Sequence, residues 1–163
     1  MKRAFFITNR IIEYLLIIIF ALLVLDVLWQ VIARHLVGSS SSFTEEFARF
    51  AFIWLAILGA AYLNGQRGHL AIDFWLNKLD AEKRKQRQVI IEILMLIFAI
   101  IVMVIGGGNL VYITLSLGQK SSVLGIPLGV VYAIVPFSGL LIVFYSLFHI
   151  SQPEALETKE KSS

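Results

Sequence analysis

The chain contains no cysteine, only three prolines and little charge, and each shortage excludes a class of protein. Without cysteine there is no disulfide, no thiolate metal site and no cysteine nucleophile. Charged residues make up 15% of the 163 residues, well below the share in a typical soluble domain. The P-loop, nucleophile-elbow and zinc-protease motifs are absent as well, so the sequence predicts no enzyme.

Long apolar runs dominate the chain instead. Hydrophobic residues make up 58% of the sequence, and the mean hydropathy is +0.83. A helix needs about 20 apolar residues to cross the hydrocarbon core of a bilayer. Four runs reach this length, at residues 11–33, 43–63, 89–117 and 127–150. The sequence therefore predicts an all-α integral membrane protein with four transmembrane helices.

The distribution of Lys and Arg predicts the topology. Eleven of the 14 basic residues precede the first helix, lie between the second and third, or follow the fourth. Because basic segments stay in the cytoplasm, we expect both termini there and a bacterial inner membrane as the setting. The first run is too long for a signal peptide and lacks a cleavage site. Residues 1–150 are thus expected to form the membrane domain, and residues 151–163 a polar cytoplasmic tail.

The segment at residues 69–79 is too short to cross a membrane but is amphipathic. Wound as a helix, its apolar side chains, including Trp75, share one stripe, and Asp73 lies on the opposite side. We expect a short helix in the cytoplasmic interface, with Trp75 at the level of the lipid headgroups. A partly ordered loop is the alternative.

Charged residues gather where the second predicted helix begins. Ser42 and Glu45 have the spacing of a capping box. Glu45 and Glu46 lie at the positive end of the helix dipole, and Arg49 can pair with either of them. The group fits a self-neutralising helix start and equally well a contact site for a partner.

Asp26 lies within the first apolar run, where a lone carboxylate costs about 3 kcal/mol. Gln30 follows four residues later on the same helical face. We favour a helix anchor, with Asp26 bonded to Gln30 or to another helix, over a proton or ion site. Ion sites combine several polar groups with broken helices, and this chain offers few. Glu92, near the inner edge of the third helix, is expected to reach outward to water.

Small residues predict where helices approach closely. Residues 106–108 are three consecutive glycines within the third helix, and they favour close packing over local unwinding. Gly59 and Ala60 form a similar patch on the second helix. Pro136 lies inside the fourth helix and should kink it.

The three histidines, His35, His69 and His149, lie at or beyond the ends of the predicted helices. A membrane haem needs axial histidines that face each other inside the bundle. The histidines are therefore expected to be interfacial or capping residues. The sequence predicts no cofactor and no bound metal.

One combination of motifs resembles a known family. The matching elements are residues 42–50 (SFTEEFARF), Trp54, residues 59–61 (GAA), residues 69–73 (HLAID), residues 125–127 (GIP), Tyr132 and Pro136. They are similar to the small membrane subunit of tripartite ATP-independent periplasmic (TRAP) transporters, over roughly residues 10–150. Phe43 stands where that family often has tryptophan.

The resemblance implies a non-catalytic subunit of a sodium-driven importer of organic acids, of the sialate or C4-dicarboxylate type. In such systems a soluble periplasmic protein captures the substrate, and a large multi-helix membrane subunit carries it inward. The small subunit packs against the large one as a static scaffold. The resemblance also implies partner contacts for Glu45, Glu46 and Arg49, and a holding role in the interfacial segment for His69 and Asp73. Nothing in these residues identifies the substrate.

Two other functions remain open on the sequence alone. A membrane anchor subunit of a redox enzyme shares the size, the helix count and the lack of catalytic motifs; a Soret band in the purified protein would support it. A stand-alone small exporter could use Asp26 as its proton site. Self-association without a larger partner would favour that exporter.

Overall fold

The structure is a computed structural model that describes residues 2–37, 42–66 and 81–151, without the side chains of residues 2, 37 and 81–85. The elements of this part are α1 (Lys2–Val37), α2 (Ser42–Gly65), α4 (Ala81–Phe98), η1 (Ala99–Gly106), α5 (Gly107–Ser116), α6 (Leu128–Tyr132) and α7 (Ile134–Ser151). Four helical stretches are long and apolar enough to cross a membrane. The predicted all-α membrane fold is thereby confirmed. The interfacial segment with His69, Asp73 and Trp75, and the polar tail, lie outside the described residues.

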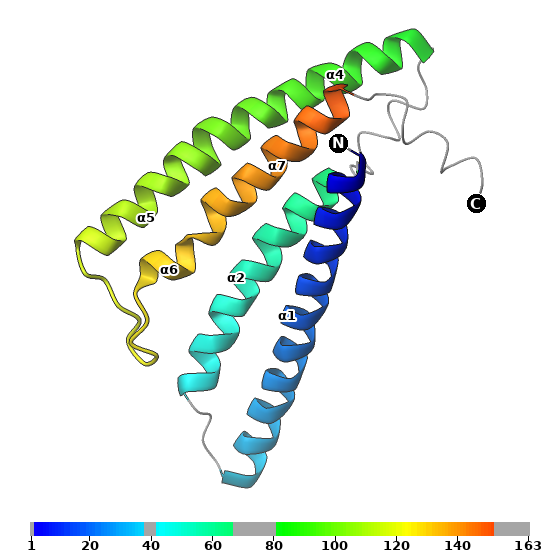
Figure 1. Ribbon diagram of the computed structural model, residues 1–163. Helices are drawn as coiled ribbons and strands as arrows, with labels where there is room; N and C mark the ends of the chain where they lie inside the picture. The colour runs from blue at the N-terminus through cyan, green and yellow to red at the C-terminus, as the bar shows by residue number, and fades with distance from the viewer. Residues whose placement is uncertain (1, 38–41, 67–80, 152–163) are drawn as a thin grey trace.

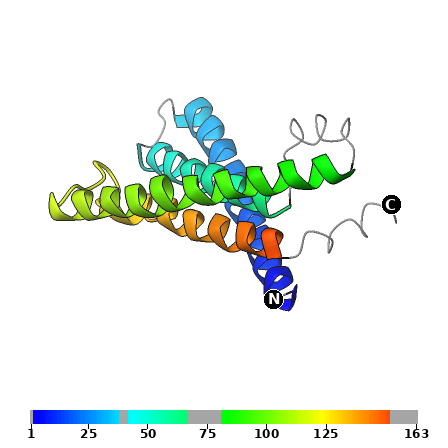
Figure 2. The same ribbon diagram turned by 90° about the horizontal axis from the view of Figure 1, so that it is seen from above.

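The four spans lie in a row with α7 inside it. α1 packs along α2, α2 packs along α7, and α7 packs along the continuous helix formed by α4, η1 and α5. Figure 1 shows α1 and this continuous helix on opposite sides of the row. The helices converge near Lys2 and Ser151, which we call the terminal end. They spread towards the loop end, which holds the start of α2 and the loop at residues 117–127 (Figures 1 and 2).

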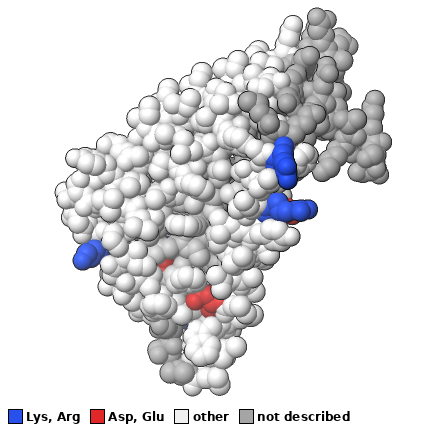
Figure 3. Space-filling view, in the orientation of Figure 1, with Lys and Arg blue, Asp and Glu red and all other residues white. Residues whose placement is uncertain are grey.

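Burial is concentrated in the fourth span. In its most apolar stretch 39% of the residues are buried, against 6%, 11% and 6% in the first three spans. Ile134, Ser138, Ile142, Tyr145 and His149 are all buried and recur every three or four positions along α7, which is the spacing of one helical stripe. The other helices leave many large apolar side chains exposed, and Figure 3 shows a broad face with few charged side chains. Such a surface suits lipid or a protein partner.

Aromatic rings join three helices at the terminal end. The Phe5 ring of α1 stacks on Phe148 of α7, with 4.3 Å between the ring centroids, and meets Tyr145 edge-on at 5.6 Å. A Cβ atom at Gly65 of α2 would lie only 2.8 Å from the Tyr145 ring. The absence of a side chain at Gly65 therefore lets α2 approach α7 closely here.

The third span widens into a π-helix at Ala99–Gly106 without leaving the helical conformation. Gly106 and Gly107 keep ordinary helical dihedral angles, with φ of −63° and −64°. The helix therefore does not unwind at these glycines, which was the alternative. The π-helix packs against α7, where a Cβ atom at Gly139 would lie 2.7 Å from Cβ of Met103.

The fourth span is interrupted between α6 and α7. α6 ends at Tyr132 and α7 begins at Ile134. Pro136 has no N–H to donate to the Tyr132 carbonyl group four residues earlier, and its ring crowds that position. The break at Ala133 therefore lies one turn before Pro136, as expected for a proline inside a helix.

Candidate functional site

The charged residues at the start of α2 divide between two directions. The carboxylate of Glu46 accepts hydrogen bonds from the backbone N–H groups of Val123 and Leu124, both at 2.9 Å. The hydroxyl group of Ser121 donates a further bond to it. Val123 and Leu124 lie 77 and 78 residues after Glu46 in the sequence. Glu46 thus connects α2 to the loop at residues 117–127.

Glu45 and Arg49 lie on the exposed side of α2 instead. Arg49 forms no ion pair or hydrogen bond with any residue in the described part of the chain. Arg49 therefore does not form the pair with Glu45 or Glu46 that its spacing would allow. Phe52 and Ala60 are exposed along the same face, so Glu45 and Arg49 lie at one end of an otherwise uncharged helical stripe. That arrangement leaves its guanidinium group available for a partner.

The loop itself has a defined shape. Gly118, with φ of +61°, ends α5. Its N–H bonds the carbonyl oxygen of Leu115, and the N–H of Gln119 bonds that of Thr114. This pattern is a Schellman motif, in which glycine takes the left-handed position. The loop then closes on itself through the N–H of Ser121 to Ile126 and a bridge between Lys120 and Pro127.

Asp26 and Gln30 are bonded to each other on α1. The amide nitrogen of Gln30 donates to the Asp26 carboxylate at 2.7 Å. Both side chains are half-buried. They continue the stripe of α1 that contains Phe5, Ile12 and Leu23, which are buried. Ile12 packs against Leu58 of α2, so this stripe of α1 faces α2.

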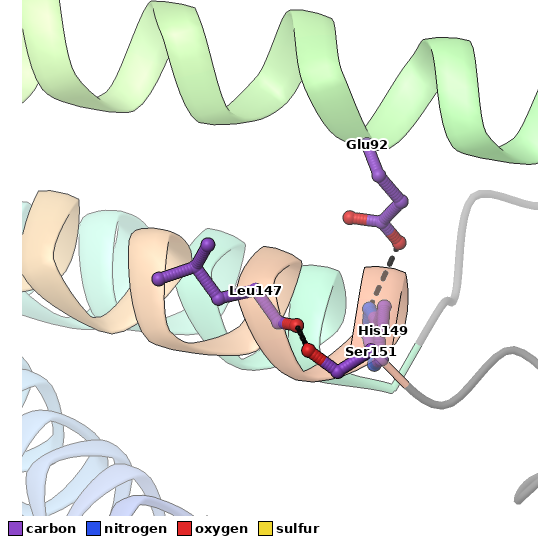
Figure 4. Close-up of polar contacts among 4 residues, drawn as sticks. All are labelled: Glu92, Leu147, His149 and Ser151. Carbon is purple, nitrogen blue, oxygen red and sulfur yellow. Dashed lines mark hydrogen bonds and ion pairs between the residues drawn. The ribbon is translucent and has the colours of Figure 1, made fainter.

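Glu92 corrects one sequence-based expectation. It does not reach outward to water but turns towards α7, where its Oε1 atom lies 2.8 Å from Nδ1 of His149 (Figure 4). The His149 side chain is completely buried, and that of Glu92 is 12% exposed. This hydrogen bond joins the third span to the fourth. His149 lies in the last turn of α7 as predicted, but it belongs to the protein interior.

The predicted small residues have different surroundings. A Cβ atom at Gly107 would lie 2.8 Å from Val135 and 3.0 Å from Pro136, so the third and fourth spans touch there. Gly59 and Gly108 have open space around them. Gly106 and Ala60 are exposed. Among these predicted glycine and alanine positions, Gly107 therefore makes the close approach, and the exposed members of the set face lipid or a partner.

Three further glycines carry close contacts that the sequence does not single out. They are Gly65, Gly129 and Gly139, whose added Cβ atoms would lie 2.8 Å or less from a neighbour. None belongs to a run of glycines. Each of them lies on the inward face of its own helix, so they could be identified once the helix faces are known.

The indole of Trp54 links α2 to the broken fourth span. Its Nε1–H donates to the carbonyl oxygen of Val131 at 3.0 Å. Val131 lies at the end of α6, next to the break at Ala133. This bond gives a carbonyl group beside the interruption a second helix as its partner inside the protein.

Among the residues that the structure describes, no group of three acidic or histidine side chains is arranged to hold a metal ion. The polar contacts described above join helices to each other or to the loop, except for the Asp26–Gln30 bond, which lies within α1. The fold and these contacts define a four-helix membrane protein whose interior polar groups maintain its own architecture.

Comparison with known proteins assigns the family. The family model described as the DctQ component of tripartite ATP-independent periplasmic transporters matches residues 23–154. The chain is 32% identical over 134 residues to a protein of Haemophilus influenzae named as a TRAP transporter small permease, covering 82% of this chain and 81% of that protein. It is 28% identical over 145 residues to the sialic acid TRAP transporter small permease SiaQ of Vibrio cholerae, covering 86% and 80%.

The chain belongs to the DctQ component family of the TRAP transporters. It is a small permease subunit of a transporter and not an enzyme. The resemblance inferred from residues 42–50 and the later motifs is thereby confirmed.

Proposed function

We propose that the chain is the static scaffold subunit of a sodium-driven importer of organic acids, packed against a large transport subunit in a bacterial inner membrane. A soluble binding protein on the periplasmic side delivers the substrate. The proposal makes the redox anchor and the stand-alone exporter the less favoured functions.

One observation supports the scaffold role above the others. Among the spans that the structure describes, the fourth is substantially enclosed, and the other three leave most of their apolar surface uncovered. The described polar groups join parts of this chain and do not converge on a substrate site. A subunit of this kind contributes membrane-embedded surface to a complex, while a larger partner carries out the transport.

Arg49 and Glu45 are the residues that we propose for partner contact. Both are exposed at the start of α2, and Arg49 has no partner within the described residues. A guanidinium group near the hydrocarbon boundary gains most from a carboxylate that pairs with it. Asp26 and Gln30 are proposed to support the contact between α1 and α2. Glu46 is proposed to contribute indirectly, by holding the loop at residues 117–127.

The substrate class is proposed from similarity. The relative from Vibrio cholerae carries the name of a sialic acid transporter component, which favours sialate over C4-dicarboxylates. The basic residues in the first turns of α1 and of α4 support cytoplasmic termini. Reporter fusions at each terminus test this orientation, and a periplasmic terminus would contradict it.

The first experiment is affinity purification of the tagged chain from its native membrane in mild detergent, followed by mass spectrometry. A stoichiometric, larger multi-helix membrane protein is the expected result. A chain that purifies alone, or only with copies of itself, would remove the scaffold proposal. A Soret band would instead restore the redox anchor.

The second experiment measures uptake by the reconstituted three-part system under a sodium gradient, with labelled sialate and succinate supplied in parallel. Arg49→Glu is expected to reduce complex yield or uptake, because it places a negative charge opposite the proposed carboxylate. Arg49→Lys keeps the charge and serves as the control. Normal yield and normal uptake in Arg49→Glu would exclude Arg49 from the interface.

A further inference from the structure

The loop at residues 117–127 has more internal hydrogen bonds than a connection between two helices requires. Besides the Schellman motif at Gly118, the N–H of Ser121 bonds Ile126 and the N–H of Leu128 bonds Gln119, both at 2.9 Å. Gly125 takes a φ of +67°, a conformation that side chains rarely tolerate. The backbone of the loop therefore has a single, well-defined path.

Glu46 adds an anchor outside the loop. Its carboxylate bonds the N–H groups of Val123 and Leu124, and hydrogen bonds to an ionised acceptor are stronger than neutral ones. Because backbone groups make these bonds, the Val123 side chain takes no part in them. Its exposed fraction is 49%, and that of Ile126 is 39%. The anchor thus fixes the loop and leaves the side chains of Val123 and Ile126 exposed.

The exposed side chains have the composition of a protein-binding surface. Val123 and Ile126 are apolar, and exposed Gln119, Lys120 and Ser122 lie near them in sequence. Lys120 is the charged residue of the loop, and because it is exposed it can pair with an acidic group of a partner. An apolar centre with a polar margin is typical of protein interfaces. A loop that is already ordered loses little entropy when a partner binds.

We propose that this loop is the docking surface for the soluble substrate-binding protein, and that Glu46 is the positioning residue that holds it in its binding shape. The inference rests on the proposed function. The loop lies beyond the last turn of α5 and before α6 at the loop end (Figure 1), where a soluble protein can reach it. Glu45 and Glu46 then have separate tasks: Glu45 faces outward, and Glu46 shapes the loop.

Site-specific photo-crosslinking tests the docking surface. A photoreactive amino acid replaces Val123 or Ile126 in the complete membrane complex, reconstituted in liposomes with the purified binding protein. Crosslinks to the binding protein are expected from both positions. Ile93 of α4 is exposed at the other end of the third span from the loop and should give none. Crosslinks only to the large subunit or to lipid would overturn the docking proposal, while co-purification with the large subunit would leave the scaffold role standing.

A matched pair of variants tests Glu46. The chain has no cysteine, so one cysteine introduced at Ser122 carries a spin label without further changes. Glu46→Gln should increase the mobility of the label and lower the crosslinking yield from Val123 by roughly fivefold. Glu45→Gln makes the same charge change one residue away and should do neither. An unchanged mobility in Glu46→Gln would overturn the positioning role, and a mobile loop with a normal crosslinking yield would overturn the link to docking.

Discussion

Glu92 of α4 and His149 of α7 face each other in the interior, with Oε1 and Nδ1 2.8 Å apart. They lie 57 residues apart in the sequence and join the third span to the fourth near the terminal end. Phe5 of α1 approaches the same histidine, with 6.0 Å between the ring centroids. The pair therefore lies where several helices meet, and its loss should be felt by the whole fold.

Removing the carboxylate of this pair should destabilise the protein strongly. Glu92→Ala leaves a buried imidazole without its acceptor, and we expect a loss of about 3 kcal/mol in the free energy of unfolding. Glu92→Gln keeps an acceptor oxygen and should lose about 1 kcal/mol or less. Unfolding in mixed detergent micelles measures both, with exposed Glu13→Ala as the control. Equal values for the three variants would show that the pair contributes nothing.

Glycines in close contact should differ sharply from glycines in open space. An added methyl group at Gly139 meets Met103 at 2.7 Å and the Val104 backbone nitrogen at 3.2 Å. Gly139→Ala should therefore cost about 1 to 3 kcal/mol of unfolding free energy. Gly108→Ala meets nothing within 4 Å and should be neutral or stabilising by up to about 1 kcal/mol, because alanine favours the helix. The same micelle titration checks the prediction, and a stable Gly139→Ala protein would contradict the close packing of α7 on η1.

The indole bond from Trp54 should stabilise the interrupted fourth span. Trp54→Phe keeps an aromatic ring but removes the donor to the Val131 carbonyl oxygen. We expect a loss of about 1 kcal/mol, with faster hydrogen exchange in the residues around Ala133. Phe52→Leu, at an exposed position on the same helix, is the control. If exchange near Ala133 does not change in Trp54→Phe, the bond does not support the break.

Asp26 should be dispensable for transport. Its carboxylate is bonded to Gln30 of the same helix and faces α2, so Asp26→Asn should preserve uptake in the reconstituted system. A decrease of about 1 kcal/mol or less in unfolding stability is expected, because an amide oxygen can still accept the bond. Complete loss of uptake with normal assembly would return Asp26 to the role of a proton site.

The sequence predicted the helices far better than their contacts. Apolar length alone locates the spans, because a bilayer sets the length of a helix that crosses it. Pro136 likewise predicts the interruption of the fourth span. Those features depend on residues close together in the chain, which is why they can be recognised without a structure.

The contacts that depend on distant residues escaped prediction. Glu46 and Glu45 look alike in sequence, and only the position of Val123, 77 residues later, separates their roles. The direction of Glu92 depends in the same way on His149. Partner contacts of Arg49, and the roles of His69 and Asp73, stay predictions; the last two residues lie outside the described part of the chain.

The spread of the helices towards the loop end has a consequence for the surrounding bilayer. Because the spans meet at one end and diverge at the other (Figure 1), the protein takes up more area in one leaflet than in the other. A tapered insertion of this kind packs best beside lipids or proteins that taper the opposite way. The shape of this small chain thus favours one orientation against its neighbours, independently of any single side-chain contact.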